Sequence, residues 1–154
     1  MTFKEKVLWA SLATTIGVWG WYFAGFVAAL AAPHFDPGAA TGRFLGAVFL
    51  LVVIQVVAIT AISIWTPKEA GAPADDRDRE FARRAYVPAF VTLSALVATL
   101  TVVAPMTIMT APAWLGDRPA ITVAIVISNA LLLSLVLAEL VRSGTQILLY
   151  RRGG

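Results

Sequence analysis

The sequence contains no cysteine and a single histidine, and these two scarcities exclude several kinds of chemistry. Without cysteine the chain cannot form disulfides, iron-sulfur sites, thiolate-zinc sites or a thiol redox couple. His34 alone cannot supply the paired axial imidazoles of a bis-histidine b-type haem. The sequence also lacks a nucleophile elbow, a P-loop and an HExxH helix. We therefore expect no enzymatic activity, no cofactor and no metal site.

Charged residues are also scarce, at 14% of the 154 residues, whereas 59% are hydrophobic. Soluble globular chains are about one quarter charged, so this composition is typical of a membrane protein. Four apolar segments are long enough to cross a hydrocarbon core of about 30 Å. They predict an all-α membrane protein in which four transmembrane helices form an antiparallel bundle of two hairpins. The expected single membrane domain, residues 1–154, comprises spans 7–32, 44–65, 86–109 and 120–141, outer loops 33–43 and 110–118, a connector 66–84 and a tail 142–154.

The basic residues are distributed unevenly among the segments outside the spans. The N-terminus, the connector and the tail together hold ten Lys and Arg residues, and the two outer loops hold one each, Arg43 and Arg118. Cytoplasmic segments carry such an excess of positive charge. We therefore expect a multi-pass protein of the inner (cytoplasmic) membrane with both termini and the connector in the cytoplasm. The basic excess records orientation, and we expect no direct nucleic acid binding.

The connector is the one hydrophilic segment, with 10 of the 21 charged residues. Its acidic residues come first and its arginines later, as suits the first turns of a helix that continues into the membrane. Asp75 with Arg79 and Glu80 with Arg84 have the spacing of mutually supporting pairs. The segment is interpreted as a solvated helix end or as a docking surface. The candidate partner contacts are Asp75, Asp76, Asp78, Arg83 and Arg84.

Among the polar residues within the apolar spans, three are candidates for a function: Gln55, Asn129 and Glu139. Gln55 and Asn129 lie at similar predicted depths, which suggests a hydrogen bond between them, worth about 0.6 to 2 kcal/mol. Glu139 is an intramembrane acid and hence a functional candidate. Its place near the cytoplasmic interface, with Arg142 three residues on, favours a structural ion pair over a proton-coupling carboxylate.

The first span carries a group of aromatic residues near and beyond its middle, which we interpret as helix packing in preference to a ligand box: Trp19, Trp21, Tyr22, Phe23 and Phe26. This span has no ionisable residue between positions 7 and 32. The small drug/proton antiporters, which share its plan of four helices, rely on a glutamate in that helix. Transport by their mechanism is therefore not expected.

The acidic-arginine run at 75–78 and the C-terminal run 137–152 resemble those of a known family. They are similar to segments of uncharacterised four-helix membrane proteins of bacteria and archaea that carry a DERD-like segment before the third helix. The likeness extends over the full length, including the opening Phe3-Lys4-Glu5-Lys6 and Trp9. Here Asp76 replaces the commoner glutamate. The family's role is unknown, and its members are often encoded beside small helix-turn-helix regulators, which implies a regulatory or sensory association.

Two functions follow as hypotheses. The first is a non-enzymatic protein of the lipid bilayer that acts by association with itself, with a larger membrane complex or with a cytoplasmic regulator, through the connector. The second is a small transporter or channel subunit that works as a homodimer or larger oligomer, with Gln55, Asn129 and Glu139 lining its path.

Overall fold

The computed structural model describes residues 3–67 and 76–152. These residues form four helices and no strand: α1 (Phe3–Ala31), α2 (Pro37–Trp65), α4 (Asp76–Trp114) and α5 (Ile121–Arg152). Each helix is long and apolar enough to cross a membrane. The predicted all-α, multi-pass membrane architecture is confirmed.

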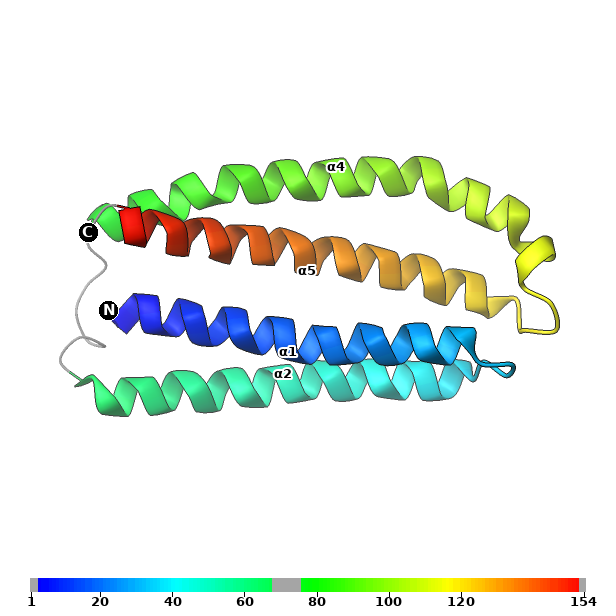
Figure 1. Ribbon diagram of the computed structural model, residues 1–154, viewed down its shortest axis with the longest axis horizontal. Coiled ribbons are helices and arrows are strands. Elements are labelled where there is room, and N and C mark those ends of the chain that lie inside the picture. The colour runs from blue at the N-terminus through cyan, green and yellow to red at the C-terminus, as the bar shows by residue number, and fades with distance from the viewer. Residues whose placement is uncertain (1–2, 68–75, 153–154) are drawn as a thin grey trace.

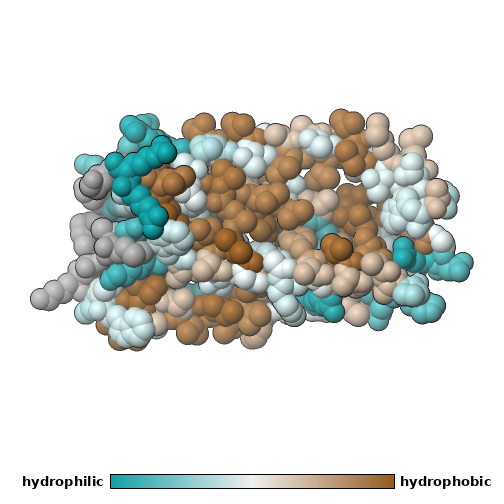
Figure 2. Space-filling model, viewed as in Figure 1, coloured by the Kyte–Doolittle hydropathy of each residue, from teal (hydrophilic) through white to brown (hydrophobic). Residues whose placement is uncertain are grey.

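The helices pack as two antiparallel hairpins that meet along α1 and α5 (Figure 1). α4 packs along α5, α5 along α1 and α1 along α2, while α2 and α5 touch over a short length. The bundle therefore has the order α4, α5, α1, α2, and its two outer helices are covered mainly from one side. Both chain ends lie at the same end of the bundle (Figure 1). Apolar side chains cover much of the middle of the surface, and hydrophilic ones gather toward the ends (Figure 2).

The loops opposite the termini are shorter than the sequence analysis predicted, because α2 begins earlier and α4 ends later. Asp36 caps α2: its carboxylate accepts hydrogen bonds from the backbone N–H groups of Gly38 (2.8 Å) and Ala39 (3.2 Å), with Pro37 in the first turn. A proline there loses no hydrogen bond, since the first N–H groups of a helix have no intrahelical acceptor. The helices therefore extend beyond the predicted limits at residues 44 and 109, and the bounds of the membrane spans themselves stay predictions.

The fourth helix is longer than the predicted 120–141, because α5 continues through the predicted tail to Arg152. At 1.5 Å per residue, the 32 residues of α5 and the 39 residues of α4 extend over about 48 Å and 58 Å. Both exceed the hydrocarbon thickness of about 30 Å. Both helices are therefore longer than a hydrocarbon core, and their charged ends, the first turn of α4 and the last turn of α5, lie beside the chain termini (Figure 1).

α4 contains Pro88, Pro105 and Pro112 and is curved along its length (Figure 1). Each proline lacks the N–H that would bond the preceding turn, which bends a helix. Five threonines of this helix donate to the carbonyl four residues earlier: Thr92, Thr99, Thr101, Thr107 and Thr110. These hydroxyls therefore need no partner from another helix.

The core lies where α1 meets α2 and α5. It is formed by Val18, Trp19, Tyr22, Ala47 and Val136. The rings of Trp19 and Tyr22 meet edge to face at 5.6 Å, and Phe26 stacks on Tyr22 at 6.3 Å. Trp21 in contrast is 57% exposed. Packing in lipid depends on such van der Waals contacts because no water is expelled. The packing interpretation is therefore confirmed for the buried part of the aromatic group.

Candidate functional site

A polar anchor joins three helices at the end of the bundle that carries the chain termini. Lys4 of α1 donates from Nζ to Oδ2 of Asp78 in α4 at 2.5 Å, and the Tyr150 hydroxyl of α5 donates to Oδ1 of the same carboxylate at 2.5 Å. The Asp78 side chain is 21% exposed and that of Lys4 34%. Hydrogen bonds to charged groups are stronger than neutral ones. This Lys4–Asp78–Tyr150 anchor ties the second hairpin to the start of the first.

Aromatic rings and arginine side chains pack at the same end of the bundle as the anchor. The Phe81 ring meets the Tyr150 ring edge to face at 5.1 Å, and the Arg77 guanidinium lies over Phe81 at 5.2 Å. Arg151 lies over Trp9 of α1 at 5.4 Å. Burial, together with the hydrogen bond to Asp78, raises the pKa of the Tyr150 hydroxyl well above its usual value. The hydroxyl therefore stays protonated and remains a donor to Asp78.

The opposite face of the same stretch of α4 is charged and exposed. Asp76, Arg79, Glu80, Arg83 and Arg84 follow the i, i+3, i+4, i+7, i+8 spacing of one helix face. The Asp76 side chain is 99% exposed and that of Arg83 79%. We call these five residues the charged rim. Asp78 lies on the other face, so one amphipathic stretch holds the anchor inside and the rim outside.

The pairing predicted within the rim is confirmed where the structure describes it. Arg84 Nε donates to Glu80 at 2.7 Å and Arg83 Nε at 3.0 Å. The hydrogen bond from Arg84, with the positive charge of Arg83, lowers the pKa of Glu80. Arg79 lies 3.6 Å from Asp76. Asp75 and its predicted pair with Arg79 lie outside the described residues.

Among the candidate partner contacts, the structure separates Asp78 from the rest. Asp78 binds Lys4 and Tyr150 inside the molecule, whereas the other three described candidates lie in the exposed rim: Asp76, Arg83 and Arg84. The Asp78 carboxylate is thus engaged by two short internal hydrogen bonds, which leaves the rim residues as the better placed candidates for a partner contact.

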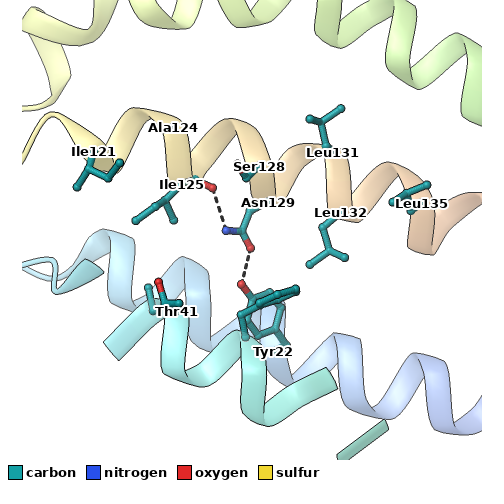
Figure 3. Close-up of a pocket in the computed structure, with 12 residues that line it drawn as sticks. Tyr22, Thr41, Ile121, Ala124, Ile125, Ser128, Asn129, Leu131, Leu132 and Leu135 are labelled. Atoms are coloured by element: carbon teal, nitrogen blue, oxygen red, sulfur yellow. Dashed lines mark hydrogen bonds between the residues drawn. The ribbon is translucent and has the colours of Figure 1, made fainter. Parts of the chain in front are cut away.

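Gln55 and Asn129 do not bond each other, so the hydrogen bond inferred from their depth is wrong. Gln55 Nε2 donates to Ser11 Oγ at 3.0 Å, across the α1–α2 contact. Asn129 accepts from the Tyr22 hydroxyl at 2.6 Å and donates from Nδ2 to the Ile125 carbonyl at 2.9 Å (Figure 3). Each amide faces α1 from a different neighbouring helix, and their partners Ser11 and Tyr22 lie eleven residues apart, about 16 Å along α1 at 1.5 Å per residue, so the two amides also lie at different depths.

Glu139 forms the predicted ion pair with Arg142. Both nitrogens of the guanidinium fork reach the carboxylate, Nε to Oε2 at 2.9 Å and Nη2 to Oε1 at 2.6 Å, and Ser143 adds a third bond at 3.1 Å. The pair lines a groove between α5 and α4 beside Tyr86 and Ala89. The predicted ion pair is confirmed, and the preference for a structural role over a proton-coupling one stays a prediction. The three candidates for a transport path lie at three different helix contacts, so the transport hypothesis gains no supporting observation.

A second groove lies between α5 and the first hairpin, at the end of the bundle away from the chain termini (Figure 3). Its volume is about 430 Å³. Within it Tyr22 and Asn129 point toward each other from α1 and α5, and Thr41 and Phe44 line it from α2. Leucine, isoleucine and alanine side chains of α5 form most of the remaining wall. We call this cavity the α5 groove.

Four residues that make these polar contacts were missed as site candidates: Lys4, Ser11, Tyr22 and Tyr150. Tyr22 could have been found from its hydroxyl, because a buried tyrosine hydroxyl needs a hydrogen-bond partner. Lys4 and Tyr150 lie 146 positions apart in the sequence. No local pattern indicates that both meet Asp78.

Comparison of the chain with known protein families, with curated proteins and with solved structures gives no match. The resemblance to the four-helix proteins with a DERD-like segment therefore stays a prediction.

Proposed function

We propose that this chain is a non-enzymatic membrane protein that acts by association, and that the charged rim is its contact surface for a cytoplasmic regulator or a larger membrane complex. The observation that carries the proposal is that the two faces of the first turns of α4 make different contacts. Asp78 holds the segment to α1 and α5, while Asp76, Arg83 and Arg84 stay exposed on the opposite face. A fixed backbone that presents exposed charges loses little entropy on binding.

The pattern of charge in the rim also suits recognition. Two arginines share one glutamate, so each of them keeps guanidinium donors for another acceptor. Complementary charge at a rim sets partner choice and association rate. An acidic surface on the partner fits this arrangement, because the rim carries three arginines and two acids.

The test is native mass spectrometry of the full chain extracted from its own membrane. A stoichiometric partner should leave the complex when Arg83 and Arg84 are both changed to Glu. The matched control is Arg152→Glu, which reverses an exposed charge at the same end of the bundle. The proposal fails if the double variant keeps every partner of the wild type, or if the control loses the same partner.

The proposed orientation places the rim and both termini in the cytoplasm, on the inner membrane, and it has its own test. Because the chain contains no cysteine, single-cysteine variants can be labelled without background. In intact spheroplasts, a membrane-impermeant maleimide should label Asp117→Cys, in the loop after α4, and leave Arg152→Cys unlabelled until the membrane is opened. The reverse labelling pattern would place the rim outside the cell and remove a cytoplasmic regulator from the proposal.

A further inference from the structure

The α5 groove has the length of a lipid chain. It extends along α5 from Ile121 to Leu135, which is about 21 Å at 1.5 Å per residue. That distance exceeds half of a hydrocarbon core of about 30 Å. Several wall residues are partly open to the surroundings, including Ile121 at 55% and Leu135 at 57% exposure. In a membrane this groove opens sideways to the hydrocarbon of the lipid.

The polar groups within the groove are mostly occupied by one another. The Tyr22 hydroxyl donates to Asn129 Oδ1, and Asn129 Nδ2 donates to the Ile125 carbonyl of its own helix. Thr41 donates to the carbonyl of Pro37. Groups satisfied in this way offer little to a polar ligand, and apart from Ser128 the rest of the wall is aliphatic or aromatic. The groove therefore suits a hydrocarbon chain.

A cation stands beside the groove, near the end that lies at the membrane surface. Arg43 lies between the wall residues Thr41 and Phe44 in the sequence of α2, six residues after the helix start, or about 9 Å along the axis. Its guanidinium lies against α1 at Gly25, where a Cβ atom would be only 2.6 Å from Nη1. It forms no salt bridge with a carboxylate of residues 3–67 or 76–152.

We propose that the α5 groove holds an acyl chain of an anionic phospholipid, whose phosphate binds Arg43. The lipid belongs to the leaflet on the side of the two short loops. The acyl chain lies along the apolar wall from Ile121 toward Leu135, and the guanidinium supplies a positive charge that binds the phosphate of the headgroup. Arginine is suited to this role because its planar fork binds phosphate oxygens bidentately. This inference is independent of the charged rim, which lies at the other end of the bundle.

The experiment measures lipids retained by the full chain. The protein is reconstituted in nanodiscs of equal parts phosphatidylglycerol and phosphatidylcholine with matched acyl chains, released gently in the mass spectrometer, and its bound lipids are counted by class. The wild type should retain one phosphatidylglycerol in preference to phosphatidylcholine. A basic residue near an anionic lipid surface shifts binding by a factor of about five, so Arg43→Gln should lower that preference about five-fold, and Arg152→Gln should leave it unchanged.

A second variant tests the groove itself. Ala124 lines the wall and is exposed, so a tryptophan there fills the groove from outside without entering the core. Ala124→Trp should lose the retained lipid, whereas Ala98→Trp, on the exposed surface of α4, should keep it. Thermal unfolding of both variants checks that each is folded.

Three results would overturn the proposal. One is equal lipid retention by Ala124→Trp and Ala98→Trp, because the groove would then not be where the lipid binds. Another is the absence of a headgroup preference that depends on Arg43, either because the wild type does not distinguish phosphatidylglycerol from phosphatidylcholine or because Arg43→Gln keeps the wild-type preference. The third is a change of oligomeric state in Ala124→Trp with unchanged lipid retention, which would assign the groove to a second copy of the chain.

Discussion

Removal of the Asp78 carboxylate should loosen the contact between the two hairpins. Asp78 accepts one hydrogen bond from Lys4 and one from Tyr150, each at 2.5 Å. Hydrogen bonds to charged groups contribute about 1.5 to 3 kcal/mol each when they are buried. The Lys4 side chain is one third exposed, which lowers its share because exposed ion pairs contribute about 1 kcal/mol or less. Asp78→Ala should therefore lower the free energy of unfolding by about 2 to 3 kcal/mol.

The assay is reversible unfolding in mixed micelles of mild detergent and dodecyl sulfate, followed by far-UV circular dichroism. The matched control is Asp76→Ala, because this carboxylate is 99% exposed and its one described ion pair, with Arg79, is 3.6 Å long. An exposed pair of this kind should change the free energy of unfolding by no more than about 0.5 kcal/mol.

A double-mutant cycle isolates the anchor from other effects of the aspartate. Lys4→Met and Asp78→Asn, alone and combined, should give a coupling energy of about 1 kcal/mol. The reasoning is refuted if Asp78→Ala is no more destabilising than Asp76→Ala, or if the cycle gives no coupling. Either result would mean that packing of α4 on α5 alone holds the second hairpin in place.

Three further changes test the remaining polar contacts. Tyr22→Phe should lower the free energy of unfolding by about 1 to 2 kcal/mol, since Asn129 Oδ1 loses its interhelical donor; a change below about 0.3 kcal/mol in the same micelle assay would contradict this. Gln55→Ala and Ser11→Ala should couple by about 0.6 kcal/mol in a double-mutant cycle, while a Gln55 and Asn129 cycle should give none. The pKa of Glu80 is lower in the folded state, so its ion pairs stabilise the protein fully above the unfolded pKa of 4.5, and this stability is lost as pH falls through the folded pKa. Glu80→Gln should therefore reduce the difference in unfolding midpoint between pH 7 and acid. An unchanged difference would show that the Glu80 pairs contribute nothing to stability.

Element boundaries could have been read more closely from the sequence than they were. Asp36 followed by Pro37 is a capping signal for the start of a helix, and it marks where α2 begins. The predicted spans were instead limited to the apolar residues. A helix does not end where its residues become polar, because the backbone hydrogen bonds continue in water, and α5 accordingly continues to Arg152.

The sequence by itself determined that the chain crosses a membrane as four antiparallel helices, because apolar runs of the right length leave the backbone no other way to satisfy its hydrogen bonds in lipid. It also determined the local pairs, such as Glu80 with Arg84 and Glu139 with Arg142, because residues three or four apart on a helix are neighbours. Only the tertiary structure decided that α5 packs between α4 and α1, and with it every contact between helices. Asn129 meets Tyr22, and Asp78 meets residues from both ends of the chain, because helix order and rotation depend on the packing of whole surfaces, which no single residue pattern encodes.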